Sequence, residues 1–182
     1  MKIGIIIGST RPGRLGSSVG KWVLDEALAH GGAEFELIEL ADYDLELLND
    51  PTVPGAANRE YADPKVRTWG QKIDELDGFV FVTPEYNHSV PAAMKNAFDS
   101  IYPEWGSKAL GLVAYGADGG VRAVEHWRTI AANAHLIAVR PQVSLGLFTD
   151  FAESGLAPLE RRTGELAGVL DAVIALSAKL RG

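Results

Sequence analysis

The sequence predicts an α/β fold in which a five-stranded parallel sheet lies between two layers of helices. Short apolar runs alternate along the chain with longer amphipathic runs, which is the pattern of strands joined by helical right-handed crossovers. The first, third and fourth apolar runs are hydrophobic on both faces, as strands between two helical layers should be. Three prolines stand at the starts of amphipathic runs, where a helix tolerates them.

The first predicted strand contains the run IGIII at 3–7 and starts at the second residue of the sequence. The second, FELIEL at 35–40, mixes polar and apolar residues and therefore suits an edge of the sheet. The five predicted strands cover residues 2–8, 35–40, 78–83, 109–115 and 136–139, with 143–147 as a candidate continuation of the last.

Each predicted helix has a recognisable start, end or apolar stripe. Pro64, Pro91 and Pro158 are placed in the first turns of three helices, and Gly31-Gly32 ends the first helix. Leucine and valine recur at helical spacing in the last one. The predicted helices cover residues 19–30, 64–76, 91–101, 121–134 and 158–180.

Five strands in this alternation favour the flavodoxin-like three-layer sandwich, with strand order 2-1-3-4-5, over a six-stranded dinucleotide fold. We expect residues 1–182 to form a single domain, because the length suits one and no repeat or low-complexity tract interrupts it. The stretch 49–63 is predicted to be a long loop, and loops of that length often border a binding site.

Composition excludes several classes of function. The net charge of −7 opposes bulk attraction to nucleic acid or an anionic membrane, so any anion site must be local. The chain has no cysteine, which excludes disulfides, iron–sulfur clusters, thiol catalysis and cysteine-ligated zinc. We find neither a signal peptide nor an apolar stretch of membrane-spanning length, and we expect a cytoplasmic protein without a metal site.

The loop after the first strand, GSTRPGRLGSS at 8–18, has the composition of a phosphate site. It offers hydroxyls and two arginines, Arg11 and Arg14, in front of a helix whose unpaired N–H groups attract anions. Its glycine spacing resembles a nucleoside-triphosphate loop, but Arg14-Leu15 stands where Lys-Ser/Thr is required, and the dinucleotide pattern G-x-G-x-x-G is absent. The alternative is a polar connection with N-capping serines.

The loops after the third and fourth strands should meet the first loop at the carboxyl edge of the sheet. In TPEYNHSVP at 83–91, an aromatic ring, an amide and backbone N–H groups suit a flat heteroaromatic ligand. A proline-bounded loop with Ser89 as helix cap is the equal alternative. The glycines of YGADGG at 115–120 either leave room for a ring or simply form a turn, and taken alone the turn is favoured.

Together, the motifs GSTRPGR at 8–14, TPEYN at 83–87 and GADGGVRA at 116–123 make the chain resemble the NAD(P)H-dependent FMN reductases over nearly its full length. The resemblance implies non-covalently bound FMN. It implies that the phosphate is held by Ser9, Arg11, Ser17, Ser18 and the amide of Val19. It further implies that the isoalloxazine is lined, largely through backbone groups, by Pro84, Glu85, Tyr86, Asn87 and His88, with Gly116 and Gly119 at its flank.

The resemblance also implies a homodimer or homotetramer, often formed through the helix after the second loop. Met94, Phe98 and Ile101 recur there at helical spacing, although the same stripe is equally consistent with ordinary core. Arg14 departs from many relatives and has three open roles: a phosphate contact, a nicotinamide nucleotide contact, or exposure to water.

The resulting hypothesis is a ping-pong oxidoreductase that oxidises NADPH or NADH and reduces a small acceptor such as a quinone, free flavin, azo dye or chromate. The cofactor carries the chemistry, so no residue is assigned as a general acid or base. Two alternatives stay open: a flavodoxin-type electron carrier without turnover, and a phosphate-binding regulatory or transferase domain without flavin.

Overall fold

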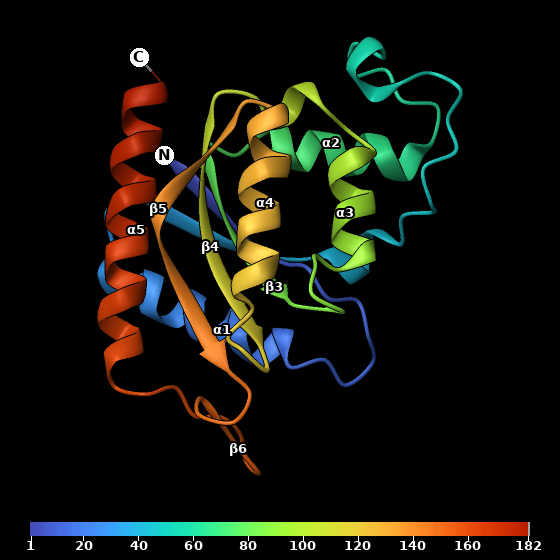
Figure 1. The fold of residues 1–182 in the computed structure, drawn as a ribbon. Helices are drawn as coiled ribbons and strands as arrows, with labels where there is room; N and C mark the ends of the chain where they lie inside the picture. Colours follow the sequence, from blue (N-terminus) through green and yellow to red (C-terminus); the bar gives the residue numbers. More distant parts are fainter. Residues whose placement is uncertain (182) are drawn as a thin grey trace.

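In the computed structural model, which describes residues 1–181, five parallel strands form one sheet in the order β2-β1-β3-β4-β5 (Figure 1). They are β1 (Lys2–Ile7), β2 (Glu34–Glu39), β3 (Gly78–Pro84), β4 (Lys108–Gly116) and β5 (Leu136–Gly146). The predicted order and edge position of the second strand are confirmed. The candidate continuation of the last strand at 143–147 is also found, since it forms a single strand, β5, with the run at 136–139.

Strand β5 is continuous because it lies at an edge of the sheet. Pro141 has no N–H to donate to a ladder, and an edge strand with an irregular register accommodates it. The pairing of β5 with β4 changes register here: Leu110 of β4 pairs with Ala138, whereas Leu112 pairs with Gln142. The strand therefore continues past the proline with an irregular register.

The helices are α1 (Gly16–His30), α2 (Pro64–Asp74), α3 (Ala92–Asp99), α4 (Val121–Asn133) and α5 (Arg161–Leu180). Three short 3-10 turns accompany them: η1 (Leu40–Tyr43), η2 (Pro54–Ala56) and η3 (Pro103–Trp105). Three predicted starts were wrong. Helix α1 begins at Gly16 and not at Val19, Pro91 is the N-cap of α3, and Pro158 precedes α5 altogether. A hairpin of β6 (Phe151–Ala152) and β7 (Gly155–Leu156) lies before α5.

The helices cover the two faces of the sheet (Figure 1). Helices α1 and α5 pack on an aliphatic core on one face, whereas α2, α3 and α4 pack on an aromatic core on the other. Met94, Phe98 and Ile101 are all buried in the aromatic core, so this stripe is used within the chain. Among residues 1–181, no helix is long and apolar enough to cross a bilayer.

Candidate functional site

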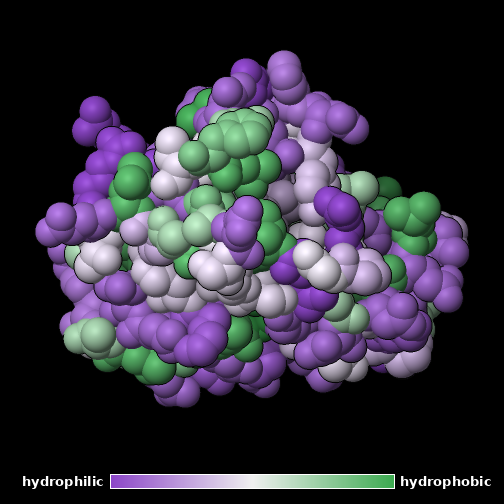
Figure 2. Space-filling view, turned by 90° about the horizontal axis from the view of Figure 1, so that it is seen from below, coloured by the Kyte–Doolittle hydropathy of each residue, from purple (hydrophilic) through white to green (hydrophobic). Residues whose placement is uncertain are grey.

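Three loops meet at the carboxyl edge of the sheet, the lower end in Figure 1. The first loop (residues 8–15) follows β1, the second loop (85–91) follows β3, and the third loop (117–120) follows β4. The first and second loops are joined by the hydroxyls of Ser9 and Tyr86, 2.8 Å apart. The second is tied to β4 by the Glu85 amide, which donates to the Tyr115 carbonyl at 2.9 Å. Figure 2 views this end and shows separate hydrophobic groups among hydrophilic ones.

The start of α1 has the features of an anion site. Among residues 1–181, no acceptor is bonded to the N–H groups of Gly16, Ser17 and Ser18, no side chain caps the helix, and its first turn carries no acidic residue. These amides bear the positive end of the helix dipole. Because α1 begins at Gly16, the Val19 amide lies inside the helix and donates to the Leu15 carbonyl at 3.1 Å.

The two arginines of the first loop have different surroundings. Arg11 is exposed, has no carboxylate partner within the described chain, and lies over the Tyr86 ring with 5.7 Å between its guanidinium carbon and the ring centroid. Arg14 instead donates to the Glu39 carboxylate at 2.7 Å, and Ser17 donates to the other oxygen of Glu39 at 3.2 Å. Arg11 is therefore the arginine available to an anion, whereas Arg14 holds the loop to the end of β2.

Glu39 is a site residue that the sequence reasoning missed. It ends β2, where a glutamate in a mixed edge strand gives no local signal, and its two partners lie 22 and 25 positions away in the sequence. The hydroxyl of Ser18 is also engaged, since it donates to the Leu15 carbonyl at 2.8 Å. Ser17 and Ser18 thus face an anion with their backbone amides, and their hydroxyls stabilise the loop.

The second loop is a tight two-residue turn. The backbones of Tyr86 and Ser89 exchange hydrogen bonds of 3.0 and 3.1 Å, and Asn87 and His88 between them have φ of 50° and 66°. Positive φ at both central positions is the type I′ geometry. The N–H groups of Asn87 and His88 have no acceptor among residues 1–181, so they are available at the tip. Ser89 does not cap α3; its hydroxyl lies 2.8 Å from Nδ1 of His126.

Glu85 joins the second loop to the third. Its carboxylate, 8% exposed, accepts from the guanidinium of Arg122 at 2.7 Å and from the Arg122 amide at 3.0 Å. It therefore occupies the N-terminus of α4. Gly120 immediately precedes that helix with φ of 74°, and a Cβ there would lie 2.9 Å from the Tyr115 nitrogen. Gly119 shares this φ, so the third loop requires both glycines for its course.

A buried ion pair fixes the segment after β5. Asp150 is fully buried and receives two 2.9 Å hydrogen bonds from Arg162, one from Nε and one from Nη2. It also accepts from the Gly146 amide at 2.9 Å. Burial alone would raise the pKa of Asp150, but the Arg162 guanidinium and these donors hold it well below its usual range. The Leu147 amide donates to the Gly116 carbonyl, which connects this segment to the third loop.

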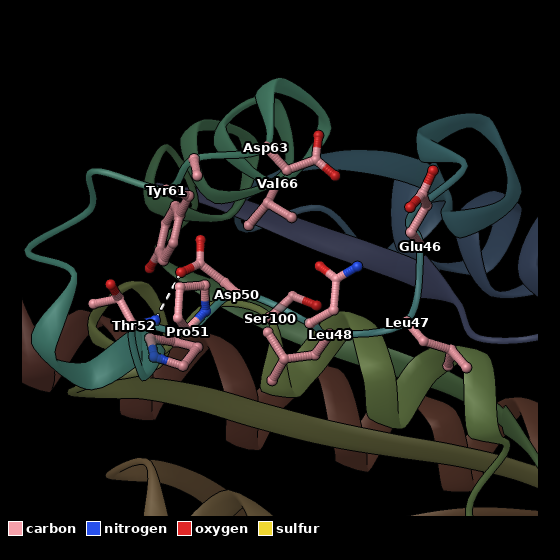
Figure 3. A pocket seen from close by; sticks show the side chains of 13 residues that line it. Glu46, Leu47, Leu48, Asp50, Pro51, Thr52, Tyr61, Asp63, Val66 and Ser100 are labelled. Carbon is pink, nitrogen blue, oxygen red and sulfur yellow. Dashed lines mark hydrogen bonds between the residues drawn. The ribbon is translucent and has the colours of Figure 1, made fainter.

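A partly open pocket of about 290 Å³ lies elsewhere (Figure 3). Its lining comes from the 46–54 loop, the segment 61–66 and Ser100. The predicted long loop does border this cavity. Ser100 follows the carboxyl end of α3, however, whereas the second loop precedes its amino end. Eight helical residues separate these ends by about 12 Å. The uncapped amides and the unpaired arginine are at the sheet edge, which identifies that edge as the candidate site.

An uncapped helix N-terminus at the carboxyl edge of a flavodoxin-like sheet is the arrangement of a site for a phosphorylated ligand. The chain belongs to the NADPH-dependent FMN reductase family, whose model matches residues 1–150.

Two curated relatives illustrate the similarity. The NAD(P)H-dependent FMN reductase C4B3.06c of Schizosaccharomyces pombe is 40% identical over 119 residues, which are 65% of this chain and 60% of that protein. The NAD(P)H:quinone oxidoreductase of Solanum tuberosum is 32% identical over 100% of this chain and 95% of its own length. The chain thus spans less than two thirds of the fission yeast relative and nearly all of the potato one.

The solved structure of FerB, a flavoenzyme NAD(P)H:(acceptor) oxidoreductase from Paracoccus denitrificans, shares the fold. Its TM-score is 0.76 and its sequence identity 24%, over 98% of this chain and 97% of FerB. The flavodoxin-like strand order predicted from the sequence is therefore also that of a solved flavoenzyme.

The residues at the edge fit FMN by their own chemistry. Three unbonded amides and an unpaired arginine suit a phosphate dianion. The free N–H groups of Asn87 and His88 suit the carbonyls and ring nitrogens of a flat heterocycle. The glycines of the third loop allow its backbone to pack closely against Glu85, Ser144 and β4, which places the loop at the same edge.

Proposed function

We propose that the chain is an FMN-dependent NAD(P)H oxidoreductase that reduces a small acceptor, such as a quinone, in a ping-pong cycle. The observation that carries the proposal is the uncapped first turn of α1 beside the unpaired Arg11, at the same sheet edge as the type I′ turn at Asn87 and His88. The names of the curated relatives, FMN reductase and quinone oxidoreductase, support it.

In this proposal the chain binds and orients the cofactor. The amides of Gly16, Ser17 and Ser18 and the guanidinium of Arg11 hold the phosphate. The second loop presents its free amides to the ring, while Gly116 and Gly119 flank it. Bound FMN supplies the two-electron redox chemistry. The overall reaction converts NAD(P)H, a proton and a quinone into NAD(P)⁺ and a hydroquinone.

In this proposal the Glu85 side chain does not line the flavin ring but positions the second loop. Its carboxylate is held by Arg122, so it positions the second loop against α4. The acceptor and the nicotinamide bind in turn on the open side of the site. Phe148, which is 84% exposed, follows Leu147, whose amide is bonded to Gly116 of that site. An exposed aromatic ring provides a stacking surface for a planar acceptor.

Steady-state kinetics of the purified chain test the proposal. With FMN present, we expect oxidation of NADPH or NADH by menadione, with parallel double-reciprocal lines when both concentrations are varied. FMN binding without turnover would indicate an electron carrier. A protein that binds no FMN would indicate a phosphate-binding domain of another class.

We further propose that residues 1–182 act as one domain, in the cytoplasm, as a homodimer or homotetramer. The family resemblance supports the assembly, and Leu47 and Leu48 offer exposed apolar surface for it, 77% and 42% exposed. Light scattering coupled to size exclusion tests the assembly, and a monomer at micromolar concentration would refute it.

A further inference from the structure

Tyr115, at the end of β4, carries a buried hydroxyl without a partner. The residue is 5% exposed, and its Oη makes no hydrogen bond among residues 1–181. Burial raises the pKa of Tyr115, so the hydroxyl keeps its proton at neutral pH. An unsatisfied buried hydroxyl destabilises a fold, and phenylalanine would avoid that cost. The hydroxyl therefore calls for a role in the bound state.

The Tyr115 hydroxyl lies beneath the first turn of α1. A Cβ at Gly16 would stand 2.8 Å from this hydroxyl and 3.7 Å from Cβ of Ser9. Ser9, 1% exposed, is 2.8 Å from the hydroxyl of Tyr86. Tyr86 is half-buried, and Arg11 lies over its ring. Three hydroxyls thus lead from the core to the surface of the first loop.

The protons of these hydroxyls can be arranged in two directions. In the first arrangement Tyr86 donates to Ser9, and Ser9 donates to Tyr115. The proton of Tyr115 then has no acceptor, and the proton of Tyr86 is not available to a ligand. If Tyr115 donates to Ser9 and Ser9 donates to Tyr86, every enclosed proton has an acceptor. Only Tyr86, the outermost member, then has its proton free to donate outward.

We propose that Tyr115, Ser9 and Tyr86 form a one-directional hydrogen-bond relay that makes Tyr86 a donor to the phosphate group held at the start of α1. The relay requires the Ser9 side chain to turn so that its oxygen accepts from Tyr115 while it keeps its bond to Tyr86. Tyr115 is a positioning residue that never touches the ligand. This inference rests on the proposed function for the identity of the ligand, although any phosphate at α1 would use the same donor.

The variant Tyr115→Phe removes only the first hydroxyl of the relay. We expect its FMN affinity to fall about two- to tenfold, the scale of one neutral hydrogen bond, while the affinity for riboflavin, which lacks the phosphate, is unchanged. The thermal midpoint of the ligand-free variant should equal or exceed that of the wild type. Tyr102→Phe is the matched control: its hydroxyl donates to the Asn133 carbonyl at 2.6 Å, away from the sheet edge, so FMN affinity should not change.

A double-mutant cycle tests the route through Tyr86. In a Tyr86→Phe background, Tyr115→Phe should have no further effect on FMN affinity, because the last donor is already gone. Ser9→Ala breaks the relay at its centre and should match Tyr115→Phe, which keeps the test decisive if Tyr115→Phe does not fold.

Several results would overturn the inference. Unchanged FMN affinity in both Tyr115→Phe and Ser9→Ala would do so, as would equal losses for FMN and riboflavin or additive losses in the cycle. If the wild type does not bind FMN, the proposed function fails, and the relay is judged by stabilisation with inorganic phosphate. In that case a smaller phosphate-induced rise of the thermal midpoint in Tyr115→Phe supports the relay, and an equal rise overturns it.

Discussion

Replacing Arg11 with alanine separates the anion-binding role of the first loop from its structural role. Arg11 has no carboxylate partner among residues 1–181, and its guanidinium carbon lies 5.7 Å from the centroid of the Tyr86 ring. An exposed cation–π contact contributes about 0.5–1 kcal/mol, so Arg11→Ala should lower the free energy of unfolding by about 1 kcal/mol at most. A hydrogen bond between guanidinium and phosphate contributes about 1.5–3 kcal/mol, so the Kd for FMN should rise roughly ten- to 150-fold.

Arg14→Ala provides the matched control for this experiment. Arg14 is paired with Glu39, whose side chain is 24% exposed, so its loss should lower the free energy of unfolding by about 1 kcal/mol, between a surface pair and a buried one. Its effect on FMN affinity should be smaller than that of Arg11→Ala. Fluorescence titration of FMN and urea unfolding measure the two quantities. Equal FMN affinity in Arg11→Ala and wild type, or a larger loss in Arg14→Ala, would refute the assignment.

Four further predictions concern the scaffold and the open side of the site. Asp150→Ala leaves the buried Arg162 guanidinium with Glu165 as its remaining carboxylate partner among the described residues, so it should lower the free energy of unfolding in urea by up to about 3 kcal/mol, the lower end for a broken buried pair. Because the folded-state pKa of Asp150 lies below its unfolded value of about 3.9, the wild type should retain this stabilisation above that pH and lose it as the pH falls further, whereas a flat acid profile would contradict the pair. Glu85→Gln should lower the thermal midpoint by about 2–4 °C, given that Arg122 is 38% exposed, and should weaken FMN binding; unchanged FMN affinity would show that the second loop keeps its position without the charge. Phe148→Ala should leave the thermal midpoint and the FMN affinity unchanged. It should raise KM for menadione, a planar acceptor, and leave KM for ferricyanide unchanged. Equal KM values for menadione in the variant and the wild type would exclude stacking on this ring.

Much of the fold was accessible from the sequence because its strands are distinct in composition. Runs that are apolar on both faces fall on β1, β3 and β4, and their alternation with amphipathic runs indicated a parallel sheet, for which the number of five strands favoured the observed order. The hairpin of β6 and β7 was not predicted, since two-residue strands carry no periodicity. Pro158 was misleading because a proline tolerated in a first turn is also tolerated in the loop before it.

The candidate site was predictable in its location and less so in its contacts. Which loops share an edge follows from topology, but which side chain meets which depends on packing between distant segments. Glu39 pairs with Arg14, and Glu85 caps α4 across 37 positions, so neither role is visible in a local motif. The family resemblance implied a phosphate contact for the Val19 amide, whereas in the structure this amide is bonded to Leu15 and the three amides before it are the unbonded ones among residues 1–181.

The absorbance spectrum of the purified chain with FMN, recorded anaerobically before and after NADPH or NADH and then a quinone, tests the central claim most directly. The account predicts a protein-bound flavin spectrum that persists through gel filtration, loses its visible band on addition of the nicotinamide nucleotide and regains it with the quinone. A chain from which FMN separates completely, or whose bound flavin keeps its visible band in the presence of both nucleotides, would contradict it.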